Sequence, residues 1–320
     1  MRVLLTGGTG YLGRAIAQAL IARGHDVVVF SRRASASGAP GTAFDGDVRN
    51  ADDLRRAAAG CDGLVHTAAL VSIWQRRRQD FDDVNVGGLR NAVAAAKAAG
   101  IARFVYTSSF LARPPHGEST PIAANDYQRT KVAADAAATE AVRQGCPMVR
   151  IYPGVIYGPG WQTEGNLLGR LIADHLKGRL PGLIGPEMRW SFAYIDDVAR
   201  GHCEALVRGQ PGSQYALGGE NASQRRPFEI VEEETGRRPP RRLPFGVAEV
   251  LGMAEEVRVG IFGGLPLVTR GTVEIFRHDW SLDSTDAVRD LGYTMTPLDV
   301  GVRRTLASFS SQLRRSPTGE

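Results

Sequence analysis

The sequence predicts an α/β fold in which a doubly wound parallel sheet is followed by a smaller C-terminal lobe. Two observations lead to this prediction. Short runs rich in β-branched residues alternate with helical patterns over residues 3–152, as in parallel strands joined by right-handed helical crossovers. A glycine-rich loop also separates the first of these runs from the first helical pattern.

The alternation defines the expected elements of the sheet domain. We expect strands at residues 3–5, 27–30, 63–66, 104–107 and 148–152. We expect helices between these strands, near residues 13–23, 51–59, 82–99 and 127–144. Together they predict one parallel sheet that is covered by helices on both faces.

Prolines and glycines become frequent after Tyr152, which indicates loops and a second lobe at the open end of the sheet. We expect residues 1–157 to form the first domain and residues 158–320 to form mainly the second lobe, with a helix near 165–177. Residues 190–207 have the pattern of a strand that enters a helix, and we expect this segment to return to the first domain.

The composition excludes several classes of protein. With 43% hydrophobic and 23% charged residues, the chain is typical of an ordinary folded protein. No run approaches the roughly 20 apolar residues of a membrane span, and the first strand leads directly into the glycine loop rather than a signal-type cleavage site. Cys61, Cys146 and Cys203 lack metal-type spacing. We therefore expect a soluble, cytoplasmic protein with reduced thiols, no bound metal and no membrane partner.

The net charge of +5 does not indicate a nucleic-acid partner. Most arginines are scattered in short pairs, and the one dense run, residues 237–242, lacks the interleaved aromatic residues that stack on bases. Of the 39 basic residues only three are lysines, so the position of each lysine is informative.

The glycine loop at residues 6–13 lies where backbone N–H groups and a helix dipole can bind a pyrophosphate. On spacing alone it is a glycine-rich turn, but its place between a strand and a helix predicts a dinucleotide-binding Rossmann domain. The candidate contacts are Gly7, Gly10, Tyr11, Leu12 and Gly13.

The end of the second strand predicts which nicotinamide cofactor binds. A carboxylate at this place accepts the ribose hydroxyls of NAD, whereas here the strand is followed by Ser31, Arg32 and Arg33. A hydroxyl and two guanidinium groups suit a 2′-phosphate, so we expect NADP(H) to be preferred, with Arg32 as the leading contact and NAD(H) as the alternative. In an arginine-rich chain both arginines are also plausible surface residues.

The candidate chemistry centres on Tyr127 and Lys131, which the spacing places on one face of a helix. A neighbouring ammonium lowers the pKa of a phenol and makes it a usable general acid and base. A hydroxyl is also needed to hold a substrate carbonyl. Ser109, at the end of a predicted strand, is the first choice and Ser108 the alternative.

These segments together resemble the extended short-chain dehydrogenase/reductase superfamily, also called the NAD-dependent epimerase/dehydratases, over nearly the whole chain. Beyond the glycine loop, the resembling segments are residues 46–48, 66–69, 85–88, 106–109, 127–131, 153–160 and 194–199. Residues 215–219 and 290–293 are most similar to the branch that contains 3β-hydroxysteroid dehydrogenases, dihydroflavonol 4-reductases and hopanoid-associated sugar epimerases.

The resemblance implies contacts to the adenosine half of the cofactor. Asp47 would meet the adenine amino group and Val48 the adenine ring, although Asp47 is equally placed to cap the helix that begins near Asn50. Ala68 and Ala69 would line the adenosine side, or would only permit close packing.

The resemblance also implies contacts to the nicotinamide half. Lys131 would contact the nicotinamide ribose, Pro153 and Val155 would flank the nicotinamide, and Thr107 and Tyr127 would lie beside the cofactor. Asn85 would stabilise the active-site end of its helix.

Two tryptophans in loops, Trp74 and Trp161, are the candidate substrate contacts, although core packing is the usual role of such residues.

The first functional hypothesis is hydride transfer between NAD(P) and a secondary alcohol or ketone of a small apolar or moderately polar substrate. The alternative is a nucleotide-sugar epimerase with tightly bound NAD, in which Arg170, Arg179 and Arg189 supply the cations for a diphosphate. A non-catalytic NADP sensor is a third hypothesis, opposed by the intact Tyr127 and Lys131.

The resemblance further implies a homodimer packed through the helices near 82–99 and 127–144. The alanine-rich faces of these helices, residues 92–96 and 133–138, would permit close contact between two copies.

Overall fold

A seven-stranded parallel sheet is the largest element of the fold. The computed structural model describes residues 1–161 and 163–315. In spatial order the strands are β3 (Thr42–Asp45), β2 (Asp26–Ser31), β1 (Arg2–Thr6), β4 (Gly63–His66), β5 (Arg103–Thr107), β6 (Met148–Pro153) and β10 (Gln214–Leu217). The chain runs outward from β1 to β3 and then returns to the other side of β1. Its carboxyl edge between β1 and β4 is therefore the switch point at which such sheets bind ligands.

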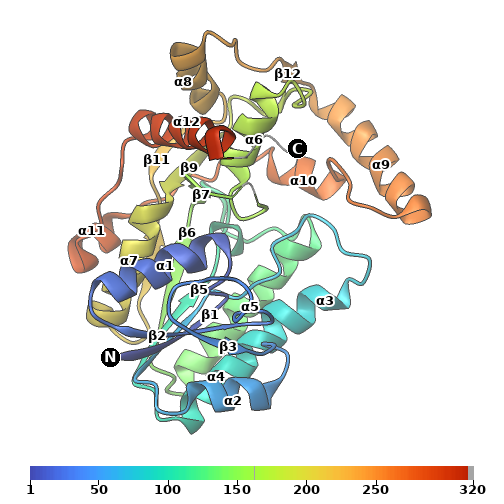
Figure 1. Ribbon diagram of the computed structural model, residues 1–320. Coiled ribbons are helices and arrows are strands. Elements are labelled where there is room, and N and C mark those ends of the chain that lie inside the picture. The colour runs from blue at the N-terminus through green and yellow to red at the C-terminus, as the bar shows by residue number, and fades with distance from the viewer. Residues whose placement is uncertain (162, 316–320) are drawn as a thin grey trace, which may run out of the picture.

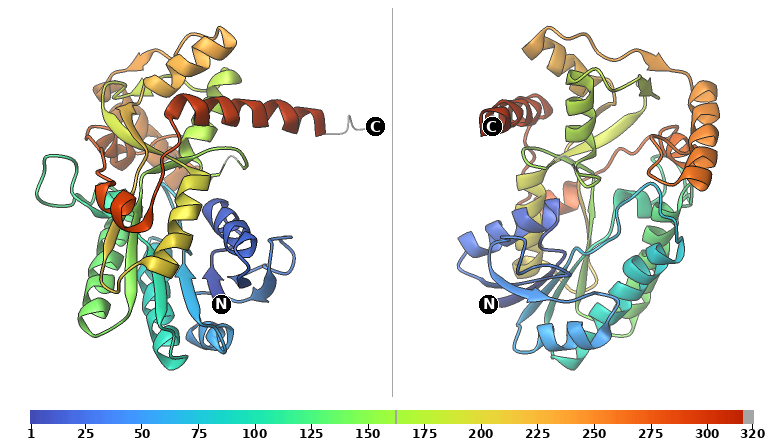
Figure 2. Two further views of the ribbon diagram at one scale, coloured as in Figure 1. Left: turned by 90° about the vertical axis from the view of Figure 1, so that its left-hand side faces the viewer. Right: turned by 45° about the vertical axis from the view of Figure 1, so that its right-hand side comes forward.

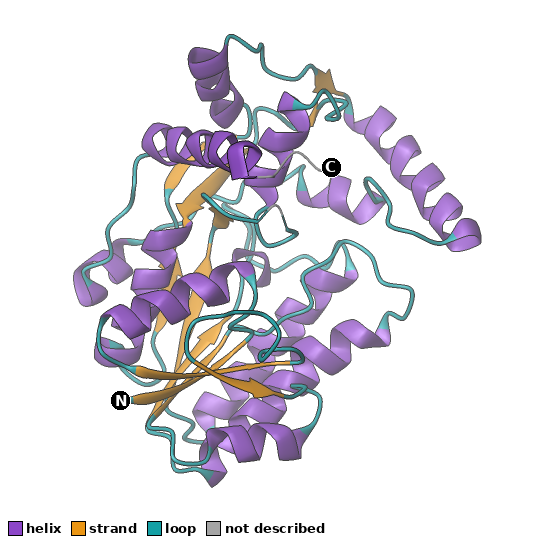
Figure 3. Ribbon diagram, in the orientation of Figure 1, coloured by secondary structure: helices purple, strands orange, loops and turns teal. Residues whose placement is uncertain are grey.

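Helices cover both faces of this sheet, as Figures 1 and 3 show. One face is covered by α1 (Tyr11–Ala22), α7 (Ile195–Arg208) and α11 (Thr285–Leu291), and the other by α2 (Ala51–Ala58), α4 (Gly88–Ala98) and α5 (Asp126–Arg143). Ile16, Ala17 and Leu20 show why α1 forms here, because their helical spacing puts three buried side chains on one face.

The smaller lobe is built from two short sheets and four further helices, above the large sheet in Figures 1 and 2. One sheet joins β7 (Val155–Tyr157), β9 (Arg189–Tyr194) and β11 (Glu220–Ser223), and the other joins β8 (Leu183–Ile184) and β12 (Arg242–Leu243). The helices are α6 (Leu167–Leu176), α8 (Arg226–Thr235), α9 (Phe245–Phe262) and α10 (Arg270–Ile275). A further helix, α12 (Leu298–Arg315), packs on α8.

Three short helices lie in the connections that lead to the sheet's open edge. They are α3 (Gln79–Phe81), a π-helix (Asp82–Gly87) and a 3₁₀ turn (Phe110–Ala112). The π-helix continues into α4, so the single helix expected near 82–99 is wound differently in its first six residues. Such local widening is common near functional sites.

The predicted doubly wound parallel sheet and small C-terminal lobe are confirmed. Two edge strands, β3 and β10, were not expected. β3 is short, mostly exposed and preceded by a segment rich in serine, glycine and proline, so it has little hydrophobic pattern. β10 is separated from the other strands of its sheet by the small lobe, and only its pairing with β6 shows where it belongs.

The segment 190–207 is shared between the two parts of the molecule. β9 pairs with β7 and β11 in the small sheet, whereas the following helix, α7, packs along α1 on the large sheet. The division of the chain at residue 157 stays a prediction.

The alanine-rich faces proposed for a dimer mostly serve the chain's own core. Ala92, Ala95 and Ala96 on α4, and Ala134 and Ala138 on α5, are buried in the cluster beneath the large sheet. Alanines that remain exposed on these helices are Ala94, Ala98, Ala133 and Ala136. The homodimer therefore also stays a prediction.

We expect Leu20→Ala to lower the free energy of unfolding by about 2–5 kcal/mol, because the fully buried Leu20 side chain would leave a cavity between α1 and the sheet. Urea denaturation measures this change. Ile21→Ala is the matched control on the same helix, since Ile21 is 39% exposed and its truncation should cost no more than about 0.5 kcal/mol. Equal losses in the two variants would contradict the assigned burial.

Candidate active site

The glycine loop brings the ends of β1 and β4 into direct contact. Gly7 has a left-handed φ of 72°, and a Cβ atom at this position would lie 2.8 Å from the backbone of Ala68. A Cβ atom on Gly13 would overlap the carbonyl oxygen of Gly7. The Gly10 N–H donates to that carbonyl at 2.9 Å. Glycine is therefore required at both positions by the close approach of the backbone, and the start of α1 stays open to a pyrophosphate.

The remaining residues of the loop face inward. Leu12 packs against the core cluster of the sheet domain. Tyr11 is buried, and a Cβ atom at Gly160, in the segment that follows β7, would lie 3.2 Å from its ring. The Tyr11 hydroxyl is buried without a hydrogen-bond partner among the described residues. The start of α1 thus lies against the loop that leads into the small lobe.

The end of β2 presents a hydroxyl and two free cations. The Ser31 hydroxyl is buried and has no hydrogen-bond partner in the described part of the chain. Arg32 and Arg33 are exposed, and neither forms an ion pair with a described residue. Arg32 lies near enough to Asp47 to help lower the pKa of that carboxyl. These groups can accept an anion at the place where a 2′-phosphate would lie.

Asp47 and Val48 lie at the outer end of the site. The Asp47 carboxylate accepts two hydrogen bonds from the Arg49 guanidinium, at 2.6 and 3.0 Å, which hold its pKa below the usual range. The alternative expectation that Asp47 caps α2 is wrong, because the Asn50 side chain accepts hydrogen bonds from the N–H groups of Asp52 and Asp53. Val48 is buried against Gly88.

Tyr127, Lys131 and Ser109 are brought together where α5 crosses the end of β5. The Ser109 hydroxyl lies near enough to Tyr127 to favour a lower pKa of the phenol, and it accepts the Leu111 N–H at 3.2 Å. Lys131 is buried and donates from Nζ to the main-chain carbonyl of Thr107 at 3.0 Å. Ser108 points elsewhere and donates to Asp135 at 3.0 Å. The geometry thus places Ser109, rather than Ser108, beside the phenol.

Burial, rather than the lysine, dominates the ionisation of Tyr127. The net lowering of the phenol pKa that we expected from Lys131 is not found: desolvation raises the pKa of Tyr127 to about 12, and the nearby Ser109 hydroxyl opposes this shift. Desolvation likewise lowers the pKa of Lys131 to about 8, although Asp135 favours its charged form. At neutral pH both groups hold their protons, so the phenol can act as an acid toward a carbonyl oxygen.

Hydrogen bonds between buried polar residues hold α5 against the segments at the ends of the strands. Asn85 accepts from the Leu70 N–H at 2.8 Å and donates to the Thr130 hydroxyl at 2.9 Å, which links the loop after β4 to α5. The hydroxyl of Thr107 contacts His202 on α7 at 2.9 Å, so only its carbonyl faces Lys131.

His66 is a neighbour of this centre that the sequence reasoning did not select. Its Nδ1 lies 2.8 Å from the Thr6 hydroxyl, and burial followed by the charge of Lys131 lowers its pKa to about 3. A neutral His66 adds no second positive charge beside Lys131. One feature of the sequence indicates this role, because His66 lies in the segment 66–69 at the end of a predicted strand.

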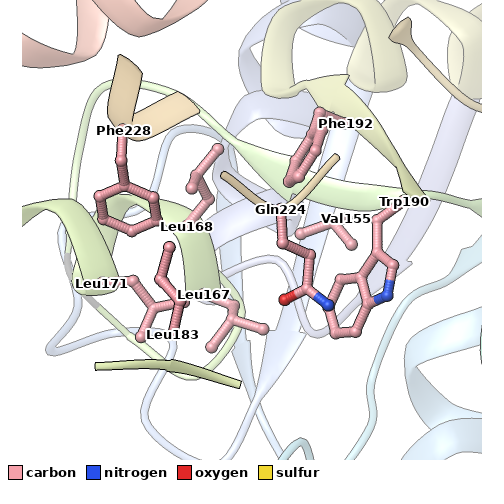
Figure 4. Close-up of a pocket in the computed structure, with 9 residues that line it drawn as sticks. All are labelled: Val155, Leu167, Leu168, Leu171, Leu183, Trp190, Phe192, Gln224 and Phe228. Carbon is pink, nitrogen blue, oxygen red and sulfur yellow. The ribbon is translucent and has the colours of Figure 1, made fainter. Parts of the chain in front are cut away.

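A small apolar cavity of about 20 Å³ lies in the small lobe (Figure 4). Its lining residues are Val155, Leu167, Leu168, Leu171, Leu183, Trp190, Phe192, Gln224 and Phe228. Val155, one of the two residues expected to flank the nicotinamide, is therefore part of its wall, and Pro153 lies two residues earlier at the end of β6. Ala69 is half-buried in the loop after β4.

The two tryptophans expected to contact substrate lie outside this wall. Trp161 is 52% exposed, and the Arg14 guanidinium stacks 4.5 Å from its ring centroid, beside the start of α1. Trp74 is half-buried in the loop after β4. Trp190 of β9 lines the pocket instead.

Within the described residues, no group of three histidine, cysteine, aspartate or glutamate side chains is placed to hold a metal ion. None of the described helices is long and apolar enough to cross a membrane.

Comparison with known proteins gives matches over most of the chain. The NAD dependent epimerase/dehydratase family matches residues 3–218. Sterol demethylase protein B of Methylococcus capsulatus is 36% identical over 78% of this chain and 80% of its own length. A putative dihydroflavonol 4-reductase of Synechocystis is 30% identical, over 90% of this chain and 88% of its own. The crystal structure of gox2253 has a TM-score of 0.81 and 29% identity, covering 98% of both chains.

We expect Gly13→Ala to weaken dinucleotide binding about tenfold or more, because the new Cβ overlaps the Gly7 carbonyl and distorts the N-terminus of α1. Fluorescence titration with NADPH measures the affinity, and thermal unfolding reports whether the variant is folded. Gly260→Ala is the matched control, since nothing lies within 4 Å of its Cβ position. A folded Gly13→Ala variant with unchanged affinity would refute this role for the loop.

Proposed function

The chain belongs to the NAD-dependent epimerase/dehydratase family, and on that premise we propose that it transfers a hydride between NADP(H) and a secondary alcohol or ketone. It is an enzyme of the extended short-chain dehydrogenase/reductase type, and the resemblance inferred from its sequence is confirmed. The proposed substrates are small and apolar or moderately polar.

The observation that carries this proposal is the junction of α5 with the end of β5, where the buried Lys131 binds the Thr107 carbonyl and Tyr127 lies near Ser109. A substrate carbonyl oxygen that accepts from both hydroxyls would be polarised by Ser109 and protonated by Tyr127. When bound, NADP(H) supplies the hydride that goes to the carbonyl carbon. In the reverse direction Tyr127 takes the proton from the alcohol.

Lys131 supports the proton transfer from the same face of α5. Its ammonium is buried beside the reacting centre and anchored to the Thr107 carbonyl. A fixed positive charge there stabilises the phenolate that Tyr127 becomes after it gives up its proton. Asn85 and His66 are positioning residues, because they act through Thr130 and Thr6 rather than on the substrate.

The preference for NADP(H) is proposed from the end of β2. Among the described residues the Ser31 hydroxyl has no hydrogen-bond partner and Arg32 and Arg33 form no ion pair, so these groups suit a 2′-phosphate. No carboxylate directly follows the strand. The Asp47 carboxylate already accepts hydrogen bonds from the Arg49 guanidinium.

The epimerase hypothesis is less well supported by the small lobe. Arg170 is paired with Glu164, and Arg189 donates to the Asn221 carbonyl at 2.7 Å. No charged side chain is among the described residues that line the apolar pocket. Arg179 is exposed and forms no ion pair with a described residue, so the apolar lining of the pocket, rather than a lack of cations, is what favours a ketone. The intact Tyr127 and Lys131 oppose a non-catalytic sensor. We also predict that the protein is cytoplasmic and forms a homodimer.

We expect Tyr127→Phe to lower kcat for ketone reduction by about a hundredfold to ten-thousandfold, because the proton donor is removed. NADPH affinity should be nearly unchanged. Steady-state kinetics with any reduced ketone and NADPH titration measure the two quantities. Tyr215→Phe is the control, since that buried phenol faces Asp290 at 3.4 Å, away from the site. Full activity in Tyr127→Phe would rule out the proposed acid.

Arg32→Ala should raise the Kd for NADPH about tenfold or more and leave the Kd for NADH unchanged, because only NADPH carries the 2′-phosphate. Titration of both nucleotides measures the difference. Arg55→Ala, at an exposed arginine on α2, controls for the loss of one surface charge. Equal changes for the two nucleotides would argue against the 2′-phosphate contact.

A further inference from the structure

We propose that the small lobe docks on the surface of a lipid membrane with anionic headgroups, through an apolar face of α9 and a cluster of cations beside it. The helix lies in the plane of that surface and does not cross the membrane. The proposal goes beyond the proposed reaction and does not depend on it. It replaces the expectation of no membrane partner, which rested on the lack of a spanning run, because a helix that lies in the surface needs no such run.

The outer side of α9 is apolar, where a surface helix is normally polar. Figure 1 and the right-hand view of Figure 2 show α9 along the outer rim of the small lobe, with no described element over its outer side. Its inner side packs tightly, since a Cβ atom on Gly252 would lie 2.9 Å from the backbone of Arg270 at the start of α10. An apolar set gathered on one uncovered helix indicates a contact surface. The exposed apolar side chains of the helix include Val247, Val250, Leu251, Met253, Val257 and Ile261.

The apolar surface continues into the loop that follows α9. Phe262, at the end of the helix, is 81% exposed, and Leu265 and Leu267 in the loop are 65% and 85% exposed. The loop is fixed on α9, because the Leu267 N–H donates to the Glu255 carboxylate at 2.9 Å. The Arg258 guanidinium likewise donates to the Leu265 carbonyl at 3.0 Å. The leucines are therefore held at the surface while these backbone groups are satisfied within the protein, which favours entry into an apolar phase.

The charged side chains of α9 do not oppose this contact, because each of them is paired. Glu255 pairs with Arg258 of the same helix at 2.9 Å. Glu256 pairs with Arg270 of α10 at 2.8 Å, and Glu249 also has an arginine partner. The three carboxylates are thus neutralised locally, and an anionic surface meets no free negative charge on the helix.

Unpaired cations gather at the end of the small lobe where α9 begins. The segment 237–242 leads into β12, which pairs with β8 just after the end of α6. The Arg237 guanidinium lies 3.4 Å from a Cβ position on Gly178, which brings the two segments together. None of the cations on these segments forms an ion pair with a described residue, so they are available to anionic headgroups. The exposed cations are Lys177, Arg179, Arg237, Arg238, Arg241 and Arg242.

These observations favour a membrane over a second copy of this chain. Val250, Val257 and Ile261 have the spacing of a helix–helix seam, but the seam would extend over only about two heptads. A seam along the helix also does not account for the exposed leucines of the loop or for the unpaired cations. An anionic membrane surface accounts for all three, because its headgroups attract the cations and its acyl chains cover the apolar side chains.

Co-sedimentation with lipid vesicles tests the proposal. We would measure binding of the whole protein, without nucleotide or substrate, to vesicles of phosphatidylcholine and to vesicles of phosphatidylcholine mixed with phosphatidylglycerol. Binding should be about tenfold or more tighter to the anionic vesicles, because each basic residue near the surface contributes to the attraction. It should weaken as the salt concentration rises from about 0.1 M to about 1 M, since salt screens these charges.

Phe262→Ser combined with Leu267→Ser should weaken binding to the anionic vesicles about tenfold or more, because two exposed apolar side chains no longer enter the acyl region. The Tm should be unchanged, since both side chains are exposed. Val207→Ser combined with Val288→Ser, at two exposed valines of α7 and α11, is the matched control and should bind as the wild type does. Leu265→Ser combined with Leu267→Ser serves the same purpose should the first variant fail to fold.

Arg241→Gln combined with Arg242→Gln should weaken binding to the anionic vesicles about tenfold or more and reduce its dependence on salt. Arg76→Gln combined with Arg90→Gln is the matched control. Both of these arginines are exposed on the sheet domain, and neither forms an ion pair with a described residue.

Three outcomes with the vesicles would overturn the proposal: no binding to the anionic vesicles, equal binding to the two kinds of vesicle, or binding that neither pair of substitutions weakens. Light scattering tests the competing occupant. A dimer that becomes a monomer in the Phe262→Ser and Leu267→Ser variant would assign this face to a second copy and would also overturn the proposal.

Discussion

The hydrogen bond from the buried Lys131 ammonium to the Thr107 carbonyl joins the helix that carries the candidate acid to the sheet that carries the cofactor loop. Because Tyr127 lies one turn before Lys131 on α5, this contact also sets where the phenol meets Ser109, two residues beyond Thr107. The bond between Asn85 and Thr130 then fixes the same turn of α5 against the loop after β4. The candidate active site depends on this junction of α5, β4 and β5.

Electrostatics at the junction favour a protonated centre. Burial raises the pKa of Tyr127 and lowers that of Lys131, yet both remain protonated at neutral pH. A neutral His66 removes one source of repulsion from the lysine. The apolar cluster against which Tyr127 packs also contains residues of the pocket wall, so the same packing shapes both.

The sequence predicted those features that depend on local pattern. All five expected strands are present, and the spacing of Tyr127 and Lys131 put both on one face of α5. Features that depend on tertiary contacts could not be predicted from the sequence. β10 joins the large sheet only through β6, and Trp190, rather than Trp161, lines the pocket because β9 enters the small sheet. The phenol pKa was misjudged since burial, which no spacing reveals, outweighs a nearby charge.

The nucleotide state of the purified protein tests the central claim most directly. Mass spectrometry after denaturation would identify any retained nucleotide, and titration of the same preparation would compare NADPH with NADH. An exchanging reductase should release its nucleotide during purification and bind NADPH more tightly than NADH. Stoichiometric, tightly retained NAD would contradict this account and would favour an epimerase, in which the same nucleotide oxidises and then reduces the substrate.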